Sequence, residues 1–321
     1  MTKFKSPGPN LHGLGCGPDE HGNRSRFASR HRRLILFITP LAIALALTLA
    51  FGFVGRTVTA QKLNADFVAV PANPIEDSRT FVRQHYLDFL SREPDAAGWQ
   101  FWIDNIDSCG ADAQCREMKR IDTSAAYFLS IEFQQTGYLV HRFYRASFGR
   151  RPLFSELLTD TQAIGNGVVV NSPGWEQLLA NNIQSFKNSW VTRPAFTSIY
   201  SGLNNAQYVD TLIANTGVTF SETDRVALID VLDNSAMTRA QVLRVIAENE
   251  AFYNAEYNAA FVEMQYFGYL RRNPQDPPDN NLNGYNFWLN KLNEFGGDFR
   301  KAEMVKAFLV SGEYRQRFRT P

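Results

Sequence analysis

The sequence predicts an all-α protein, in which one transmembrane helix precedes a helical repeat domain of about four units with three helices each. Three observations support this fold class. Apolar residues recur with the period of a helix through most of the chain after residue 80, and no segment there alternates polar and apolar residues over the length of a strand. One motif returns several times along that region. Near the N-terminus, a single apolar run is long enough to cross a bilayer.

The first element is a basic tail, residues 1–33, which contains seven Lys and Arg against two acidic residues. Its first eighteen residues include seven Gly and Pro, so we predict a disordered segment. Because the whole chain carries a net charge of +1, the part beyond the tail carries −4. That part lacks the clusters of Lys and Arg with which proteins bind nucleic acid, so we exclude a nucleic-acid partner.

The second element is the run 34–54, which holds 21 residues without a charge. As a helix rising about 1.5 Å per residue it would measure about 31 Å, close to the hydrocarbon thickness of a bilayer. The positive charge before the run predicts a single-pass protein of the bacterial cytoplasmic membrane, with its N-terminus in the cytoplasm and its C-terminal domain outside. A cleaved signal peptide is the alternative, since residues 58–60 resemble a cleavage site, and cleavage after Ala60 would release a secreted protein.

Residues 55–79 form the predicted linker, and residues 80–321 form the predicted extracytoplasmic repeat domain. Within that domain, five residues separate Cys109 from Cys115, and an oxidising compartment would let the two form a disulfide. Zinc is the alternative partner of two thiols. Only His85 and His141 are available to complete a zinc site beyond the apolar run, so we favour the disulfide.

A motif that begins with Tyr marks the repeats. Tyr86, Tyr144 and Tyr266 are each followed by Leu or Phe at the fourth position, by Arg at the sixth and by Pro at the eighth. A worn copy without the Arg and Pro begins at Tyr208, so the starts are spaced by 58, 64 and 58 residues. This spacing predicts four units. Their expected bounds lie near residues 80–137, 138–200, 201–255 and 256–317.

Each unit is expected to contain about three helices. In the first unit, a helical stripe of apolar residues precedes Arg92, and Pro94 ends that helix. Asp95 is expected to cap a second helix, with Trp99 and Trp102 on its apolar face. A third helix carries the closing phrase of the unit, which reads FLSIEF in the first unit and FLVSGEY in the last.

The first unit, YLDFLSREPDAAGWQFW, resembles the repeat of the family called domain of unknown function 4214, which occurs in bacterial exported and surface proteins. That motif runs Tyr, Leu-x-Arg-x-Pro-Asp-x-x-Gly, an aromatic pair and a closing Ser-x-Glu-Phe. The first unit matches it at Arg92, Pro94, Asp95, Gly98, Trp102, Ser130, Glu132 and Phe133. The last unit matches with an insertion, and the middle two match in part. The resemblance covers roughly residues 80–315; it implies export and a helical fold, and it implies no particular activity.

Two aromatic pairs are candidate ligand contacts, Trp99 with Trp102 and Tyr285 with Trp288. A sugar ring would stack on them if they were exposed. The same helical spacing beside other apolar residues is also typical of a core.

The arginines before the motif's proline, Arg92 and Arg272, are candidate clamps for a carboxylate or sulfate group of a ligand, and Arg150 recurs in the same place. In the structural alternative, each Arg binds carbonyls at the end of its own helix and an acid of the next helix.

Asp279, Asn281 and Asn283 are candidate Ca²⁺ ligands. With Gly284 they place three oxygen ligands and a glycine as the first half of an EF-hand loop does. Asn290 stands where the bidentate Glu is required, so the expected dissociation constant is about 10⁻⁴–10⁻³ M. A turn rich in Asn, Asp and Pro explains the same pattern without a metal. We predict no other cofactor.

The sequence contains no phosphate-binding Gly loop, zinc-protease motif or nucleophile elbow. We therefore expect a non-catalytic structural or binding protein of the cell envelope, with a glycan or another protein as its partner. The alternative is an exported enzyme that acts on polysaccharide, with Glu132 and Glu313 as its acids. Each Glu follows a Ser by two positions, however, and this predicts a Ser cap with the Glu in the first turn of a helix.

Overall fold

The computed structural model describes residues 73–319. The predicted basic tail, the predicted transmembrane helix and most of the predicted linker lie outside these residues. Within residues 73–319 the protein is all-α, because the elements are helices joined by turns and no strand occurs among them. No helix of this part is both long and apolar enough to cross a membrane.

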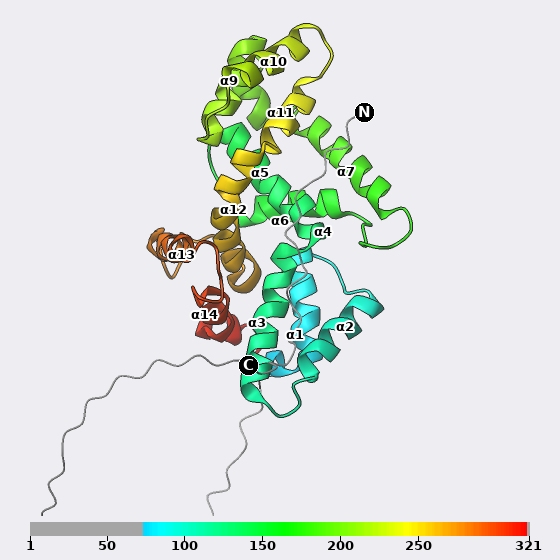
Figure 1. Cartoon of the computed structure of the whole chain (residues 1–321), viewed down its shortest axis with the longest axis vertical. Helices are drawn as coiled ribbons and strands as arrows, with labels where there is room; N and C mark the ends of the chain where they lie inside the picture. The colour runs from blue at the N-terminus through cyan, green and yellow to red at the C-terminus, as the bar shows by residue number, and fades with distance from the viewer. Residues whose placement is uncertain (1–72, 320–321) are drawn as a thin grey trace, which may run out of the picture. The chain divides into compact units, whose positions relative to one another are not determined.

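The helices follow one another in four groups, here called repeats 1 to 4 (Figure 1). A short turn of 3₁₀ helix, η1 (Pro74–Glu76), precedes them. Repeat 1 contains α1 (Ser78–His85), the π-helical turn η2 (Tyr86–Leu90), α2 (Ala96–Asp107), α3 (Ala113–Leu129) and α4 (Ile131–Gln135). Repeat 2 contains α5 (Gly137–Phe148), α6 (Phe154–Gly165), α7 (Trp175–Trp190) and α8 (Pro194–Tyr200).

Repeats 3 and 4 form the second half of the domain. Repeat 3 contains α9 (Asn205–Thr216), α10 (Glu222–Asp233) and α11 (Arg239–Ala247). Repeat 4 contains α12 (Glu250–Gln265), the π-helical turn η3 (Tyr266–Leu270), α13 (Asn283–Glu294), α14 (Met304–Val310) and α15 (Gly312–Gln316). Helix α12 begins before residue 256, where the last unit is expected to start, because Asn249 caps it by accepting a hydrogen bond from the backbone N–H of Phe252.

Repeats 1, 2 and 4 end in a short extra helix that the expected three helices do not include. Ser130 stands between α3 and α4 and accepts a hydrogen bond from the backbone N–H of Phe133. Ser311 does the same for Tyr314 between α14 and α15. Both serines have extended backbone angles, which end one helix and begin the next. The closing phrase is therefore a break with a cap rather than the continuation of a third helix.

The recurring residues of the motif build the core of each repeat. The first Tyr of every repeat is buried, and so is the aromatic residue of every closing phrase. These residues are Tyr86, Tyr144, Tyr208 and Tyr266, with Phe133, Phe196, Phe252 and Tyr314. An arginine covers each Tyr ring, namely Arg92, Arg150, Arg239 and Arg272 at 5.0, 5.2, 4.8 and 5.5 Å from the ring centroids. In repeats 1, 2 and 4 this arginine is the one of the motif, whereas in repeat 3, which lacks it, Arg239 at the start of α11 takes its place.

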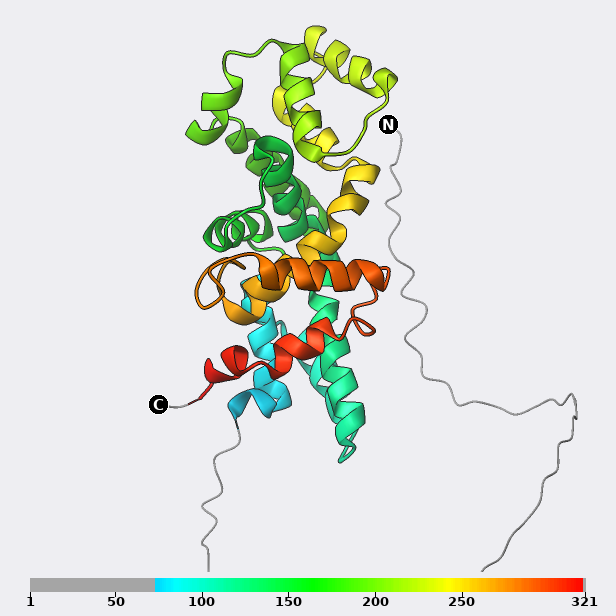
Figure 2. The ribbon, with the colours of Figure 1, turned by 90° about the vertical axis from the view of Figure 1, so that its left-hand side faces the viewer.

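The repeats pack in two pairs. Repeat 4 lies against repeat 1, where η3 meets η2 and α14 meets α3, and Figure 2 shows these C-terminal helices beside the N-terminal ones. Repeat 3 lies against repeat 2, where α9 and α11 both meet α5. Helices α5 and α12 then connect the two pairs. The first and last repeats are therefore neighbours in space, although they are the most distant in sequence.

The contact between repeats 1 and 4 centres on a glycine. A Cβ atom on Gly268 of η3 would lie only 2.4 Å from Cζ of Phe89 of η2, so the two π-helical turns approach as closely as this residue allows. Beside them, Asp88 accepts a hydrogen bond from Arg317 at 2.8 Å, and Arg317 also donates to the carbonyl oxygen of Tyr269. The crossing thus combines close apolar packing with a nearly buried ion pair.

We predict that Gly268→Ala destabilises the domain by about 1–3 kcal/mol, because the added methyl group overpacks a buried contact with Phe89. Gly202→Ala is the matched control, since a Cβ atom there would meet nothing within 4 Å, and it should change stability by about 0.5 kcal/mol or less. Urea denaturation of both variants measures the two values. Equal stability of the two variants would show that the crossing tolerates a methyl group.

Candidate functional site

Arg92, the first candidate clamp, forms an ion pair with Glu132. Its Nε and Nη2 donate to the two carboxylate oxygens of Glu132, each at 2.8 Å, and its Nη1 donates to the carbonyl oxygen of Glu93. Glu132 is nearly buried in the first turn of α4. Glu132 lies in the closing phrase of the repeat, two helices further on. Nη1 of Arg92 also lies 3.7 Å from Asp95, the acid that caps the next helix, as the structural alternative expects. A cavity of about 560 Å³ lies beside Arg92, but Glu132 already occupies the edge of the guanidinium that would bind a ligand carboxylate through two hydrogen bonds.

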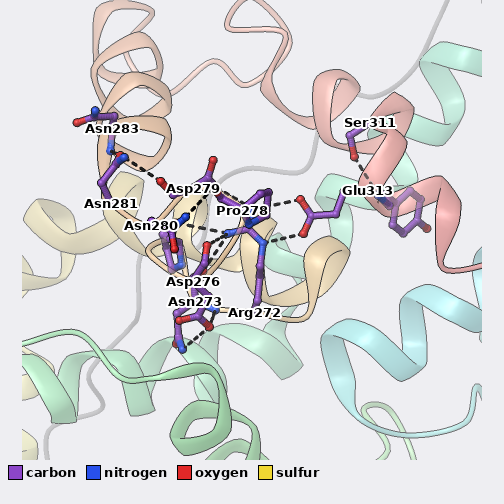
Figure 3. A network of polar contacts seen from close by, with 12 residues as sticks. Arg272, Asn273, Asp276, Pro278, Asp279, Asn280, Asn281, Asn283, Ser311 and Glu313 are labelled. Atoms are coloured by element: carbon purple, nitrogen blue, oxygen red, sulfur yellow. Dashed lines mark hydrogen bonds and ion pairs between the residues drawn. The ribbon is translucent and has the colours of Figure 1, made fainter.

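Arg272 of repeat 4 is held by still more partners (Figure 3). Its guanidinium donates to Glu313 at 2.6 and 3.1 Å and to Asp279 at 2.8 Å. Its Nη1 also donates to carbonyl oxygens of the loop that follows, those of Asn273 and Asp276 at 3.1 and 3.2 Å. Arg272 thus ties the loop between η3 and α13 to α15, and all its donor atoms are engaged in this task.

The candidate Ca²⁺ ligands occupy that same loop. The carboxylate of Asp279 pairs with Arg272, and the side-chain oxygen of Asn281 accepts the backbone N–H of Asn283 at 2.7 Å. The side chain of Asn283 points away from Asp279 (Figure 3). Within residues 73–319, no group of three or more His, Cys, Asp and Glu residues is placed to hold a metal ion. Arg272 thus occupies one carboxylate oxygen of Asp279, and the hydrogen bonds of the loop are those of a turn rich in Asn and Asp.

The two glutamates that a polysaccharide enzyme would use are engaged in the same way. Glu132 pairs with Arg92 and Glu313 pairs with Arg272, each inside its own repeat. The predicted serine caps, Ser130 and Ser311, stand two positions before them. These contacts give each Glu a structural role, in which it joins the closing phrase to the loop after the π-helical turn.

The rings of the candidate aromatic pairs are buried or partly buried against the core. Tyr285 is buried and donates a hydrogen bond to the carbonyl oxygen of Ala259 at 3.1 Å. Trp99 is partly buried and donates from Nε1 to the carbonyl oxygen of Arg79. Trp102 and Trp288 are partly buried and pack against the core rings of Tyr127 and Phe308. These four residues do not form open platforms.

Two phenylalanines that sequence reasoning missed are exposed instead. Phe101 is 62% exposed on α2, and Phe287 is 57% exposed on α13. Each lies edge-on to the following tryptophan, with ring centroids 5.0 Å apart and an interplanar angle of 76° in both repeats. Each Phe stands two residues after the first aromatic of its pair, which places it off the buried stripe of a helix. That spacing is a signal in the sequence that could have revealed them.

The sulfurs of Cys109 and Cys115 lie 1.94 Å apart and form a disulfide. It joins the end of α2 to the start of α3, where Asp112 caps α3 by accepting the backbone N–H of Cys115.

The one serine–histidine pair that resembles a catalytic dyad in residues 73–319 is sealed in the core. Ser124 lies 2.7 Å from Nε2 of His85, and Nδ1 of His85 donates to the carbonyl oxygen of Phe81. Burial lowers the pKa of His85 to about 3, so the ring is neutral and accepts a hydrogen bond from Ser124. Both side chains are almost completely buried, and they serve the packing of α1 against α3.

The other histidine forms a buried charged cluster between α5 and α12. His141 donates from Nδ1 to Glu263 at 2.7 Å and from Nε2 to Glu256 at 2.9 Å. Arg145, one turn further along α5, donates to the second oxygen of Glu256 at 3.1 Å. Burial alone would lower the pKa of His141, but the hydrogen bonds and negative charges of the two glutamates outweigh it, so its pKa is raised. Burial opposes ionisation of Glu256 too, yet His141 and Arg145 lower its pKa.

This cluster lies beside a cavity of about 850 Å³. The cavity is lined by both glutamates and Arg145, by the Arg-x-Pro segment of repeat 2, by the corresponding loop of repeat 4 and by Tyr285. It is larger than the cavity beside Arg92 and brings charged groups of two repeats together. Of these two cavities, it is therefore the stronger candidate for a small-molecule site.

Comparison of the chain with family models, with curated proteins and with solved structures found no match. The resemblance to domain of unknown function 4214 stays a prediction from the quoted motif.

The raised pKa of His141 makes stability depend on pH. A histidine whose pKa is above its ordinary 6.5 in the folded state stabilises fully below pH 6.5 and loses this effect as the pH rises through the folded value. Between those two values the free energy of unfolding should fall by up to about 1.4 kcal/mol per pH unit.

We predict this decrease as the pH rises above 6.5 for the natural chain and its absence in His141→Gln, measured by urea denaturation at each pH. His141→Gln should also cost about 3–5 kcal/mol at pH 6, because it leaves two buried carboxylates with one fewer positive partner. The same slope in both proteins would mean that His141 is neutral in the folded state.

Proposed function

We propose that the chain is a non-catalytic binding module of the bacterial cell envelope. In this proposal residues 34–54 anchor it in the cytoplasmic membrane, and the four repeats lie outside. It binds an envelope glycan through two equivalent contacts, the pair Phe101–Trp102 on α2 and the pair Phe287–Trp288 on α13.

The duplicated exposed Phe carries the proposal. A single exposed apolar side chain is ordinary on a protein surface. Here a Phe is exposed at equivalent positions of two repeats. In each repeat it packs edge-on against the Trp that follows it in the sequence. Core packing does not require either phenyl ring, since both tryptophans beneath them already cover the core. Rigid aromatic side chains with few rotatable bonds are the residues on which binding energy concentrates.

Two equivalent contacts favour a partner that presents the same group repeatedly. A glycan built of identical units does so, and simultaneous contact at both pairs would raise the overall affinity without any new interaction. Amide and carboxylate side chains next to each pair offer hydrogen bonds to sugar hydroxyls. Gln100 and Asp104 lie on the exposed face of α2, and Asn286 and Asn290 lie on that of α13.

Other features support export and the absence of catalysis. The disulfide Cys109–Cys115 is typical of an oxidising compartment. The basic tail before an uncharged run of 21 residues favours an anchor with the repeat domain outside. The glutamates considered for hydrolysis are bound to Arg92 and Arg272, each inside its own repeat, so the two do not form the facing pair of carboxyl groups that hydrolysis needs.

We predict that Phe101→Ala and Phe287→Ala each weaken binding of the full chain, purified in mild detergent, to an envelope glycan by about fivefold to tenfold, because each removes an exposed ring worth about 1 kcal/mol. The double variant should lose more than either single variant. A glycan array finds the glycan, and surface-immobilised glycan then measures the affinities.

Phe295→Ala is the matched control, since Phe295 is also exposed, at 37%, but belongs to neither pair. It should bind as the natural chain does. If the natural chain binds an envelope protein and no glycan, the glycan assignment is wrong. If both Phe variants bind every partner as tightly as Phe295→Ala does, the two pairs are not the contact.

A further inference from the structure

The lining of the cavity of about 850 Å³ contains one positive charge without an ion-pair partner in residues 73–319. The cavity forms where the Arg-x-Pro segments of repeats 2 and 4 face each other, which brings Arg151 and Asn273 into one lining. These are the middle residues of the two motifs, and the side-chain oxygen of Asn273 accepts the backbone N–H of Phe154 at 2.7 Å, which fixes the two loops together. The volume of the cavity lies within the range of about 300–1,000 Å³ found for small-molecule sites.

The other charges around the cavity have partners. Arg145 pairs with Glu256, and His141 lies between Glu256 and Glu263. Arg150 points to Glu156, to which it donates two hydrogen bonds of 2.7 and 2.8 Å. Two cations thus face two carboxylates beside the cavity, and a third cation has its own acid. These groups together carry no net charge when His141 is protonated.

Arg151 is the exception. Its guanidinium carbon lies 3.8 Å from the ring centroid of Tyr285, so an aromatic face holds it in place. Among residues 73–319, no carboxylate forms an ion pair with Arg151, and its Nη1, which is closed off from solvent, donates no hydrogen bond. The corresponding residue of repeat 1, Glu93, lies instead in an exposed pair with Arg83. A single positive charge therefore remains at the wall of the cavity.

We propose that this cavity binds a small carboxylate, and specifically a sugar acid of the uronate class, whose carboxylate pairs with Arg151. One negative charge balances the one unpaired cation. A phosphate monoester with nearly two charges would place an excess negative charge beside Glu256 and Glu263, which disfavours it. Leu153, Pro274 and Leu282 offer apolar contacts to the body of the ligand, and the exposed amide of Gln275 offers hydrogen bonds to hydroxyls.

This site is separate from the exposed Phe pairs of the proposed function, so each proposal stands or fails alone. Glucuronate, glucose and glucose 6-phosphate are titrated into the full chain in mild detergent, and calorimetry measures each dissociation constant. Glucuronate should bind at least about tenfold more tightly than glucose, which lacks the charge, and more tightly than glucose 6-phosphate. If glucuronate binds no more tightly than glucose, the proposal is overturned. If glucose 6-phosphate binds more tightly than glucuronate, the site prefers a phosphate and the assignment of a carboxylate is wrong.

Variants of the lining tie the affinity to this cavity. Arg151→Gln should weaken glucuronate binding by about tenfold or more, and Arg151→Lys should retain most of it because the charge remains. Gln275 is exposed, so its substitution leaves folding unchanged and serves as an independent test. Gln275→Glu should weaken binding and Gln275→Lys should strengthen it, each by about twofold to fivefold. Glucuronate binding that responds to none of these four changes lies elsewhere and overturns the proposal.

Discussion

The hydrogen bonds of His141 to Glu256 and Glu263 hold α5 against α12, and the arrangement of the two pairs of repeats depends on this contact. All three side chains are nearly or completely buried. A shift of either helix along the other would leave a buried charge without its partner, at a cost of several kcal/mol. The cluster therefore selects one register for the two helices. The same register places the Arg-x-Pro segments of repeats 2 and 4 face to face, and so it forms the cavity around Arg151.

The recurring and the varying residues of the motif have different tasks. The recurring Tyr, Arg and closing aromatic residues build one core four times, and Arg92 and Arg272 are fully engaged in it. The varying positions are the ones that face outward or into a cavity. The middle residue of Arg-x-Pro is Glu93 in repeat 1 and Arg151 in repeat 2, and only the latter lacks an ion pair in the part of the chain that the structure describes. In both proposals the ligand contacts come from varying positions of a common core.

Local patterns in the sequence were sufficient for the helical class and for several helix ends. Asp95, Ser130 and Ser311 cap helices as their positions predict, because a cap depends only on residues within one turn. The contact of His141 with Glu256 spans 115 residues, and no local pattern encodes which repeats become neighbours. For the same reason the cavity could not be predicted. The exposure of Phe101 and Phe287 follows from the sequence, since the helical period places both residues off the buried stripe.

Hydrogen exchange of the backbone amides under native conditions tests most directly whether α5 and α12 join the four repeats into one cooperative body. We expect amides in the middle of both helices to open only with the free energy of global unfolding. Amides of α3 and α9, one helix from each pair of repeats, should share this value. If α9 and α11 open at a distinctly lower free energy while α1 and α3 stay closed, and α5 separates from α12 in that event, the two pairs are independent and the buried His141 cluster does not hold them together.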